Sequence, residues 1–249
     1  MRRHLMLVPT LLIVAGLSIA MVGRQPMDPR FTSVFGIHCD DVLLPSGGNE
    51  YFSLDPGTFL RLEGEDDGEP VAVEISVSTR IHPISFHAEG GFMIVRTRVV
   101  VEREWVKGEL SEVSFNYFAS CPNSGNIYYF GEHVSHYKNG IVVDHDGSWV
   151  AGENGAEPGL LLPGFFLLGS RYQHEFAPEV SMDRAENVAS GLTIETPAGV
   201  FEDCVMVLET TPLEPDEEVL KVYAPGVGLI SDGQLELVEY HQLLTAPVR

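Results

Sequence analysis

Residues 128–149 concentrate the side chains of this sequence that could do chemistry. The segment reads YYFGEHVSHYKNGIVVDHDGSW and holds three of the nine histidines of the chain, His133, His136 and His145, among acidic residues. Imidazole and carboxylate groups bind divalent cations and transfer protons in catalysis. Which of these groups come together depends on the secondary structure that carries them.

The dipeptide Asn139-Gly140, which lies between two strand-like runs, predicts a β-hairpin with a two-residue turn. Such a turn pairs Lys138 with Ile141 and, further along the hairpin, pairs His133 with Asp146. Side chains alternate between the two faces of a strand. His133 and His136 are three residues apart and therefore point to opposite faces, which splits the apparent HxxH pair.

One face of the predicted hairpin brings an imidazole and two carboxylates within cross-strand reach, because His133 lies opposite Asp146 and diagonal to Asp144. These three residues make either an ion pair on a wet surface or a candidate site for a divalent cation. Asp144 does not open an EF-hand, since Trp149 and Gly155 occupy the sixth and twelfth positions. The opposite face is more apolar and is expected to point into the core; it carries Phe130, Glu132, Val134 and His136.

Sequence signatures of common catalytic sites are missing. The chain contains no G-x-S-x-G elbow, no H-E-x-x-H pair and no phosphate-binding P-loop. We therefore assign no catalytic residue and no cofactor other than the candidate divalent cation.

Strand-like runs separated by turn signals dominate the chain from residue 51 onward, and they predict an all-β fold. An antiparallel meander is expected, forming a sandwich or a flattened, partly open barrel. One short helix is expected around residues 182–188, and residues 152–164 are expected to form an apolar loop that caps the sheet. The predicted strands are residues 58–63, 71–77, 92–105, 109–118, 127–137, 141–150, 171–176, 192–195, 201–209, 219–223 and 229–239.

The N-terminus has the pattern of a secretory signal, because Arg2 and Arg3 precede an uncharged, apolar run over residues 5–23. We expect a signal peptide over residues 1–20, cut after Ala20. The competing interpretation is an uncleaved membrane anchor over residues 5–23. Either interpretation predicts an exported protein, in the periplasm, at the cell surface or outside the cell. Residues 21–50 then form a linker or N-terminal arm, and residues 51–249 a single all-β domain.

The charge balance is strongly acidic, with a formal net charge of −21. Without residues 1–20, which hold two arginines and no acid, 13 basic and 36 acidic residues give −23. This charge repels nucleic acid and anionic lipid and excludes nucleic acid as a partner. Cys39, Cys121 and Cys204 allow at most one disulfide, and their spacing is not that of a zinc site. Their pairing stays open.

Several phrases together resemble a family of exported bacterial all-β proteins without an assigned activity. The phrases are NEYFSLDPGT from residue 49, WVKGEL from 105, YYFGE from 128, GSWVAG from 147, GAEPG from 155 and YAPGVGL from 223. The resemblance covers residues 49–240. It implies an exported all-β protein and brings no catalytic residues with it.

Three functions follow from these observations. The first is an exported, non-enzymatic β-protein that binds a ligand, a partner or a component of the cell envelope. The second is a metal-binding protein or metal-dependent enzyme that uses His133, Asp144 and Asp146. The third is a structural subunit that assembles through a sheet edge. We expect them in that order.

Overall fold

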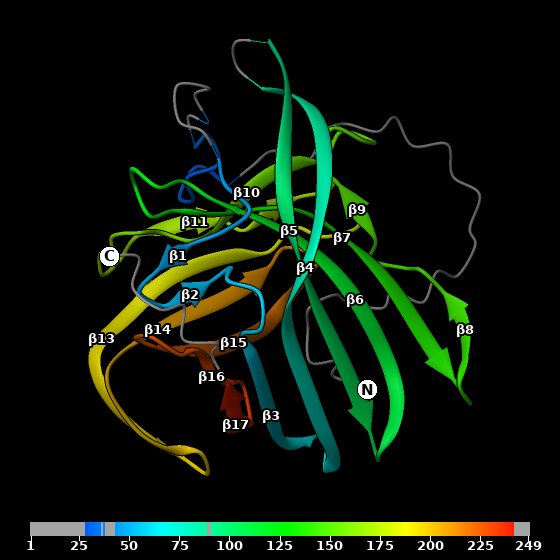
Figure 1. Ribbon diagram of the computed structural model, residues 1–249, viewed down its shortest axis with the longest axis vertical. Coiled ribbons are helices and arrows are strands. Elements are labelled where there is room, and N and C mark those ends of the chain that lie inside the picture. The colour runs from blue at the N-terminus through cyan, green and yellow to red at the C-terminus, as the bar shows by residue number, and fades with distance from the viewer. Residues whose placement is uncertain (1–27, 36, 38–42, 89–90, 242–249) are drawn as a thin grey trace.

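The computed structural model describes residues 28–35, 37, 43–88 and 91–241, and these residues form seventeen β-strands without a helix (Figure 1). The predicted all-β class is confirmed. No helix among the described residues is long and apolar enough to cross a membrane. The predicted signal peptide over residues 1–20, the alternative anchor over residues 5–23 and Cys39 lie outside the described residues. Cys121 and Cys204 are buried, free thiols.

The strands follow one another closely along the chain. Their bounds are β1 Gly48–Asn49, β2 Phe52–Ser53, β3 Phe59–Asp66, β4 Glu69–Ala88, β5 Gly91–Val106, β6 Glu109–Ser120, β7 Ile127–Lys138, β8 Ile141–Asp144, β9 Trp149–Val150, β10 Glu157–Leu162, β11 Arg171–Gln173, β12 Glu175–Phe176, β13 Arg184–Thr196, β14 Gly199–Thr211, β15 Glu214–Ala224, β16 Gly228–Asp232 and β17 Leu235–His241.

One antiparallel sheet contains almost all of these strands, in the order β11-β13-β14-β15-β16-β17-β3-β4-β5-β6-β7-β10-β12. The short strands β8 and β9 pair with β7 beside this path, while β1 and β2 form a separate two-stranded sheet. The long sheet curls into a nearly closed barrel-like shape (Figure 1). Of the two predicted arrangements, the partly open barrel is therefore the one adopted.

The two ends of the sheet meet because they are almost consecutive in sequence. The end strands β11 and β12 are separated only by His174. The side-chain amide of Gln173 donates hydrogen bonds to the carbonyls of Glu175 and Met182 at 2.8 Å and of Asp183 at 3.0 Å. The backbone N–H of His174 donates to the Asp183 carbonyl at 2.8 Å. These bonds fix the seam at which the barrel closes.

The hairpin of β4 and β5 is longer than the sequence pattern predicted, and it rises beyond the barrel (Figure 1). A register shift between Val77 and Ile81 separates its lower part from its upper part. Phe86 of the upper part packs against Phe130 of β7, with ring centroids 5.7 Å apart, and Ile84 beside it is 2% exposed. The outer face of the sheet is therefore also buried here.

The described part of the predicted arm, residues 21–50, is attached to the barrel. Leu44 exchanges two backbone hydrogen bonds with Ser120 at the end of β6, and Thr32 bridges Tyr172 of β11. Phe35 and Leu43 pack against the core. The arm thus pairs with β11 at one end of the sheet and with β6, and it adds apolar contacts to the core.

Two local predictions are wrong. The helix expected over residues 182–188 is absent, because Arg184 begins β13, whose long ladder with β14 outweighs the local helix preference. The capping loop expected over residues 152–164 is also not formed, since its second half, Glu157–Leu162, is β10, a strand of the barrel wall. Its apolar residues point into the core instead of covering the sheet from outside.

Gly159, which lies at the seam, allows barrel closure to be tested. A Cβ at Gly159 would lie 2.0 Å from the His174 carbonyl oxygen and 2.7 Å from that of Gln173. We expect Gly159→Ala to lower the free energy of unfolding by about 3 kcal/mol or more, since backbone atoms must shift. Gly68→Ala is the control: its φ of +80° is strained for alanine, but nothing lies within 4 Å, so about 1–2 kcal/mol is expected. Equal losses in urea unfolding would contradict the role of the seam.

Candidate functional site

The hairpin of β7 and β8 has the predicted turn but not the predicted register. Asn139 and Gly140 have φ angles of +53° and +74°, and Lys138 pairs with Ile141 and Tyr137 with Val142, as expected. The next pair joins His136 to Asp144, because the register shifts after Tyr137. The expected pairing is therefore wrong by one residue at His136 and by two residues at Glu132, which pairs with Trp149.

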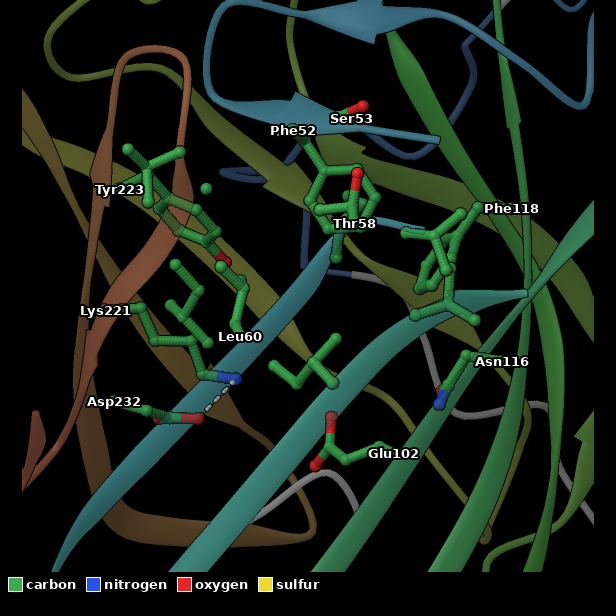
Figure 2. Close-up of a pocket in the computed structure, with 17 residues that line it drawn as sticks. Phe52, Ser53, Thr58, Leu60, Glu102, Asn116, Phe118, Lys221, Tyr223 and Asp232 are labelled. Carbon is green, nitrogen blue, oxygen red and sulfur yellow. Dashed lines mark ion pairs between the residues drawn. The ribbon is translucent and has the colours of Figure 1, made fainter. Parts of the chain in front are cut away.

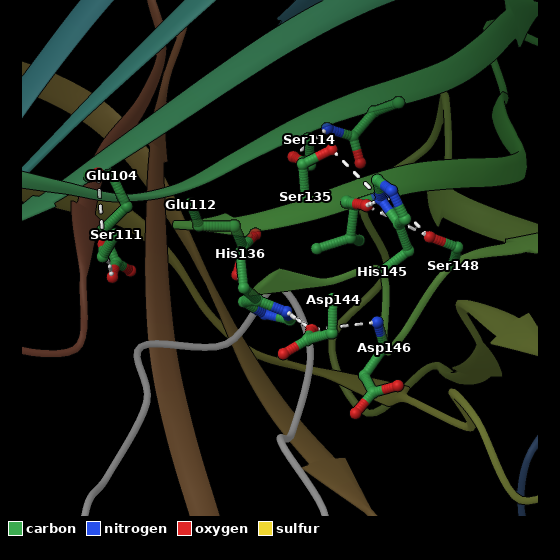
Figure 3. Close-up of polar contacts among 12 residues, drawn as sticks. Glu104, Ser111, Glu112, Ser114, Ser135, His136, Asp144, His145, Asp146 and Ser148 are labelled. Carbon is green, nitrogen blue, oxygen red and sulfur yellow. Dashed lines mark hydrogen bonds and ion pairs between the residues drawn. The ribbon is translucent and has the colours of Figure 1, made fainter. Parts of the chain in front are cut away.

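The shift is a β-bulge at Val143, the extra residue of β8, which is exposed like its neighbours Ile141 and Val142. It places the Asp144 carboxylate against the imidazole of His136, with 2.5 Å between Oδ1 and Nδ1 (Figure 3). The other ring nitrogen, Nε2, lies 3.2 Å from Oε2 of Glu112 on β6. A charged imidazole held between two carboxylates offsets the irregular pairing.

The three predicted cation ligands, His133, Asp144 and Asp146, do not come together at one point. Asp144 interacts with His136, and the backbone N–H of Asp146 donates to Asp144 Oδ1 at 3.2 Å. His133 is exposed and stacks on His145, with ring centroids 4.9 Å apart. His145 in turn donates from Nδ1 to the Val134 carbonyl at 2.7 Å. Within the part of the chain that the structure describes, no group of three or more His, Cys, Asp or Glu side chains is placed to hold a metal ion.

The expected division of β7 into a core face and a wet face holds only in part. Glu132 and Val134 are buried, as expected of the core face. Tyr129 and Ser135, expected on the wet face, are only 3% and 8% exposed. A register shift in the β6–β7 ladder pairs Glu132 with Asn116 and Tyr129 with Phe118, so Tyr129 lies on the same face as Glu132. Phe130 lies on the other face, against Phe86.

The two carboxylates change the protonation of His136. Its hydrogen bond with Glu112 and the one with Asp144 raise the pKa of His136 to about 9, against the opposing effect of burial. Burial raises the pKa of Asp144, but its hydrogen bonds with His136 and with the Asp146 N–H outweigh this and lower the pKa. The cluster is therefore an ion pair with an imidazolium at neutral pH.

The interior of the barrel holds a second charged cluster, centred on Lys221 of β15. Its ammonium lies 3.0 Å from Oε2 of Glu209 on β14 and 3.5 Å from Oδ2 of Asp232 on β16. Burial lowers the pKa of Lys221, but the two carboxylates raise it by more, to well above its ordinary value. Burial raises the pKa of Asp232 to about 6. Glu102, which has its own pKa raised well above the usual range by burial, extends from the opposite wall.

These groups lie at one end of a cavity of about 70 Å³ inside the barrel. Figure 2 shows Lys221 and Asp232 entering from one wall and Glu102 and Asn116 from the other, with Phe52 of β2 across the cavity from them. We call this the Lys221 cavity. Most of its remaining wall is apolar and includes Leu60, Ile75, Val77, Val100, Phe118, Leu161 and Leu229.

Sequence reasoning missed this cavity, although a signal is present in the run Val219-Leu220-Lys221-Val222-Tyr223. By residue type alone, the run predicts a buried leucine and an exposed lysine. In the structure Leu220 is 45% exposed and Lys221 is 5% exposed, because Lys221 shares the inward face of β15 with Tyr223. Only the partners Glu209 and Asp232, on neighbouring strands, make this burial tolerable.

Comparison with protein-family models, with curated proteins and with solved structures finds no match for this chain. The resemblance to a family of exported all-β proteins therefore rests on its sequence phrases alone.

His136 provides a test of the hairpin cluster. Its folded pKa of about 9 lies above the unfolded value of 6.5, so its stabilising effect is fully present below pH 6.5 and is lost as the pH rises through 9. We expect His136→Gln to lower the free energy of unfolding by about 1–2 kcal/mol at pH 6, allowing for partial solvent screening. By pH 9.5 the difference from the unchanged protein should fall by more than half.

Urea unfolding at the two pH values measures this difference. His87→Gln, at an exposed histidine of β4, is the control and should change little at either pH. A loss of stability in His136→Gln that is the same at both pH values would show that packing, and not the imidazolium, holds the cluster.

Proposed function

We propose that the protein is an exported, non-enzymatic binding protein whose barrel takes up the end of a small apolar molecule. The observation that carries this proposal is the Lys221 cavity, an apolar chamber with hydrogen-bonding side chains gathered at one end. Small barrels usually fill their interior with side chains. A chamber that combines an apolar wall with a few polar groups is typical of small-molecule sites.

The charges in the chamber favour a neutral head group on the ligand. Lys221 is already neutralised by Glu209 and Asp232, so it has no free charge to offer an anion. Burial raises the pKa of Glu102 well above its usual range, which favours the protonated acid, and a protonated carboxyl can donate as well as accept a hydrogen bond. Together with the Asn116 amide it suits a hydroxyl or an amide group.

The size of the chamber limits what enters it. A volume of about 70 Å³ holds on the order of five water molecules, so a longer ligand must displace part of the wall. Phe52 is the side chain best placed to move, since β2 pairs only with β1 in the small separate sheet. Its ring contacts Phe118 edge-on, with centroids 5.4 Å apart.

Export is part of the proposal and rests on the N-terminal sequence pattern of residues 1–23. The same pattern leaves open whether this segment is a cleaved signal or an anchor. The formal net charge of −21 repels anionic lipid, so any attachment to a membrane depends on residues 5–23. The ligand is expected to be a neutral molecule with an aliphatic chain.

Octanol and octanoate, which share a chain and differ in their heads, test the proposal by calorimetric titration. Octanol should bind, and octanoate should bind at least about tenfold more weakly, because its carboxylate would enter beside Glu102 and Asp232. Phe52→Ala should tighten octanol binding by opening the chamber. Phe92→Ala, which removes a 62% exposed ring at the tip of the β4–β5 hairpin, is the matched control and should leave it unchanged.

Val100→Phe fills the chamber and should abolish octanol binding while the barrel still unfolds cooperatively. Binding of octanoate as tight as that of octanol, or no octanol binding by the unchanged protein and by Phe52→Ala, would overturn the proposal.

A further inference from the structure

The loop between β10 and β11 exposes a group of apolar side chains. Its residues 163–169 read PGFFLLG, and Phe165, Leu167 and Leu168 are 82%, 65% and 61% exposed. No charged side chain occurs over residues 158–170, in a chain whose formal net charge is −21. We call residues 163–169 the apolar loop. Exposed apolar side chains that are grouped in this way mark contact sites for another protein or for a membrane.

The first part of the apolar loop is held against the barrel. The backbone N–H of Gly164 donates to Asn126 Oδ1 at 3.0 Å, and the side-chain amide of Asn49 donates to the Pro163 carbonyl at 3.3 Å. A Cβ at Gly164 would lie 1.9 Å from the Ser124 carbonyl oxygen, so the loop leaves β10 in close contact with the segment that precedes β7. These contacts fix the point at which the loop begins.

Asn187 of β13 holds the second part of the loop. Its side-chain amide donates to the Leu167 carbonyl at 3.1 Å, and its backbone carbonyl accepts a hydrogen bond from the Gly169 N–H at 2.8 Å. Between the two attachments, Phe166 packs against the core beside Tyr51, with ring centroids 6.3 Å apart. One phenylalanine of the loop thus turns inward, whereas the three exposed side chains are held outward by a loop that is fixed on both sides.

The N-terminal arm lies next to the apolar loop. The Thr32 N–H donates to the Arg171 carbonyl at 2.9 Å, and Arg171 follows Leu168 by three residues. The apolar run over residues 5–23 ends five residues before Asp28, the first described residue of the arm. Because an extended chain spans at most about 3.6 Å per residue, a bilayer that holds this run lies within about 18 Å of Asp28. An N-terminal anchor therefore places a bilayer on the side of the molecule that carries the apolar loop.

We propose that the apolar loop inserts its three exposed side chains into the surface of a bilayer in which residues 5–23 remain as an anchor. The anchor supplies the attachment, and the loop determines which side of the barrel faces the membrane. The lipid is neutral or zwitterionic, because the net charge of −21 repels anionic head groups. The proposal uses the anchor interpretation of the N-terminus and does not depend on the ligand proposed for the Lys221 cavity.

A bilayer surface suits the apolar loop better than a second copy of the chain does. Two copies that met through this loop would bring two strongly acidic molecules together, and their like charges repel. Backbone groups without partners are costly in lipid, but the Leu167 carbonyl and the Gly169 N–H are already bonded to Asn187. Interfacial segments bury their apolar face about 5–10 Å into the boundary between head groups and acyl chains, a depth that side chains reach while the strands stay in water.

Fluorescence of the full chain in phosphatidylcholine nanodiscs, with one copy in each disc, tests the proposal without contact between copies. Phe165→Trp adds an indole to the apolar loop, and bromine on the lipid acyl chains near the head groups quenches indoles that enter the bilayer. Most of the fluorescence that Phe165→Trp adds should be lost in discs of brominated lipid. Val200→Trp is the matched control: Val200 is 62% exposed at the turn after β13, at the far end of that strand from Asn187. Its added fluorescence should be kept.

A charge in the apolar loop should lift it out of the lipid. Leu168→Asp, combined with Phe165→Trp, should restore most of the quenched fluorescence, because a carboxylate is costly to move from water into lipid. Val200→Asp, combined with Phe165→Trp, is the control and should leave the quenching unchanged. Both aspartates replace exposed side chains, so the unfolding temperature should change little in either variant. Thermal unfolding therefore separates loss of the membrane contact from loss of the fold.

Three fluorescence results would overturn the proposal: no quenching of Phe165→Trp, equally strong quenching of Val200→Trp, or quenching that survives Leu168→Asp in the folded protein. Recovery of the chain from the cells that make it, cut after Ala20 and free of membranes, would overturn it as well. Octanol binding is measured separately from all of these results. Failure of the membrane contact and failure of the ligand site can therefore be told apart.

Discussion

Closure of the sheet at His174 is the constraint on which the rest of the molecule depends. The strands that end the sheet, β11 and β12, are consecutive in the chain, so the two edges of the sheet are held next to each other and the sheet must curl. The close approach of Gly159 to the backbone of residues 173–174 and the three hydrogen bonds of the Gln173 amide fix the seam. A sheet closed in this way has an inner face that water does not reach freely, and every inward side chain must find its partners inside.

The buried charged groups on the inner face differ in whether a group of opposite charge compensates them. Around Lys221 the charges are matched, since one ammonium serves the carboxylates of Glu209 and Asp232. Burial raises the pKa of both Glu132 and Glu102; Lys221 opposes this effect at Glu102, whereas no cation does so at Glu132. The matched cluster adds specificity to the strand pairing of β14, β15 and β16, whereas the unmatched acids add a cost that grows with pH as their protons are removed. The two kinds of buried charge therefore have different physical consequences, although both lie in the same barrel.

The amount of this structure that the sequence predicts depends on how local each interaction is. Strand positions such as Val71 to Val77 and the Asn139-Gly140 turn follow from alternation and turn preference, and both are observed. The bulge at Val143 depends on Glu112, more than thirty residues away in β6, and β10 depends on pairing with β7 and β12. Inspection of residues 136–144 or 157–162 alone cannot reveal these partners. The same limit hides Lys221, whose burial is explained only by the strands beside it.

The carboxylate of Glu132 is hardest to explain by stability alone. Each buried polar group without a partner costs about 1–3 kcal/mol, and glutamine or leucine at this position would keep the β6–β7 ladder, which is made by backbone atoms. The orphan indole N–H of Trp149 adds a second cost at the neighbouring pair. Unrelated packing defects would be scattered through the core. Here both costs fall on one cross-strand pair of β7 and β9, on the face of the sheet that also carries Tyr129 and Asn116.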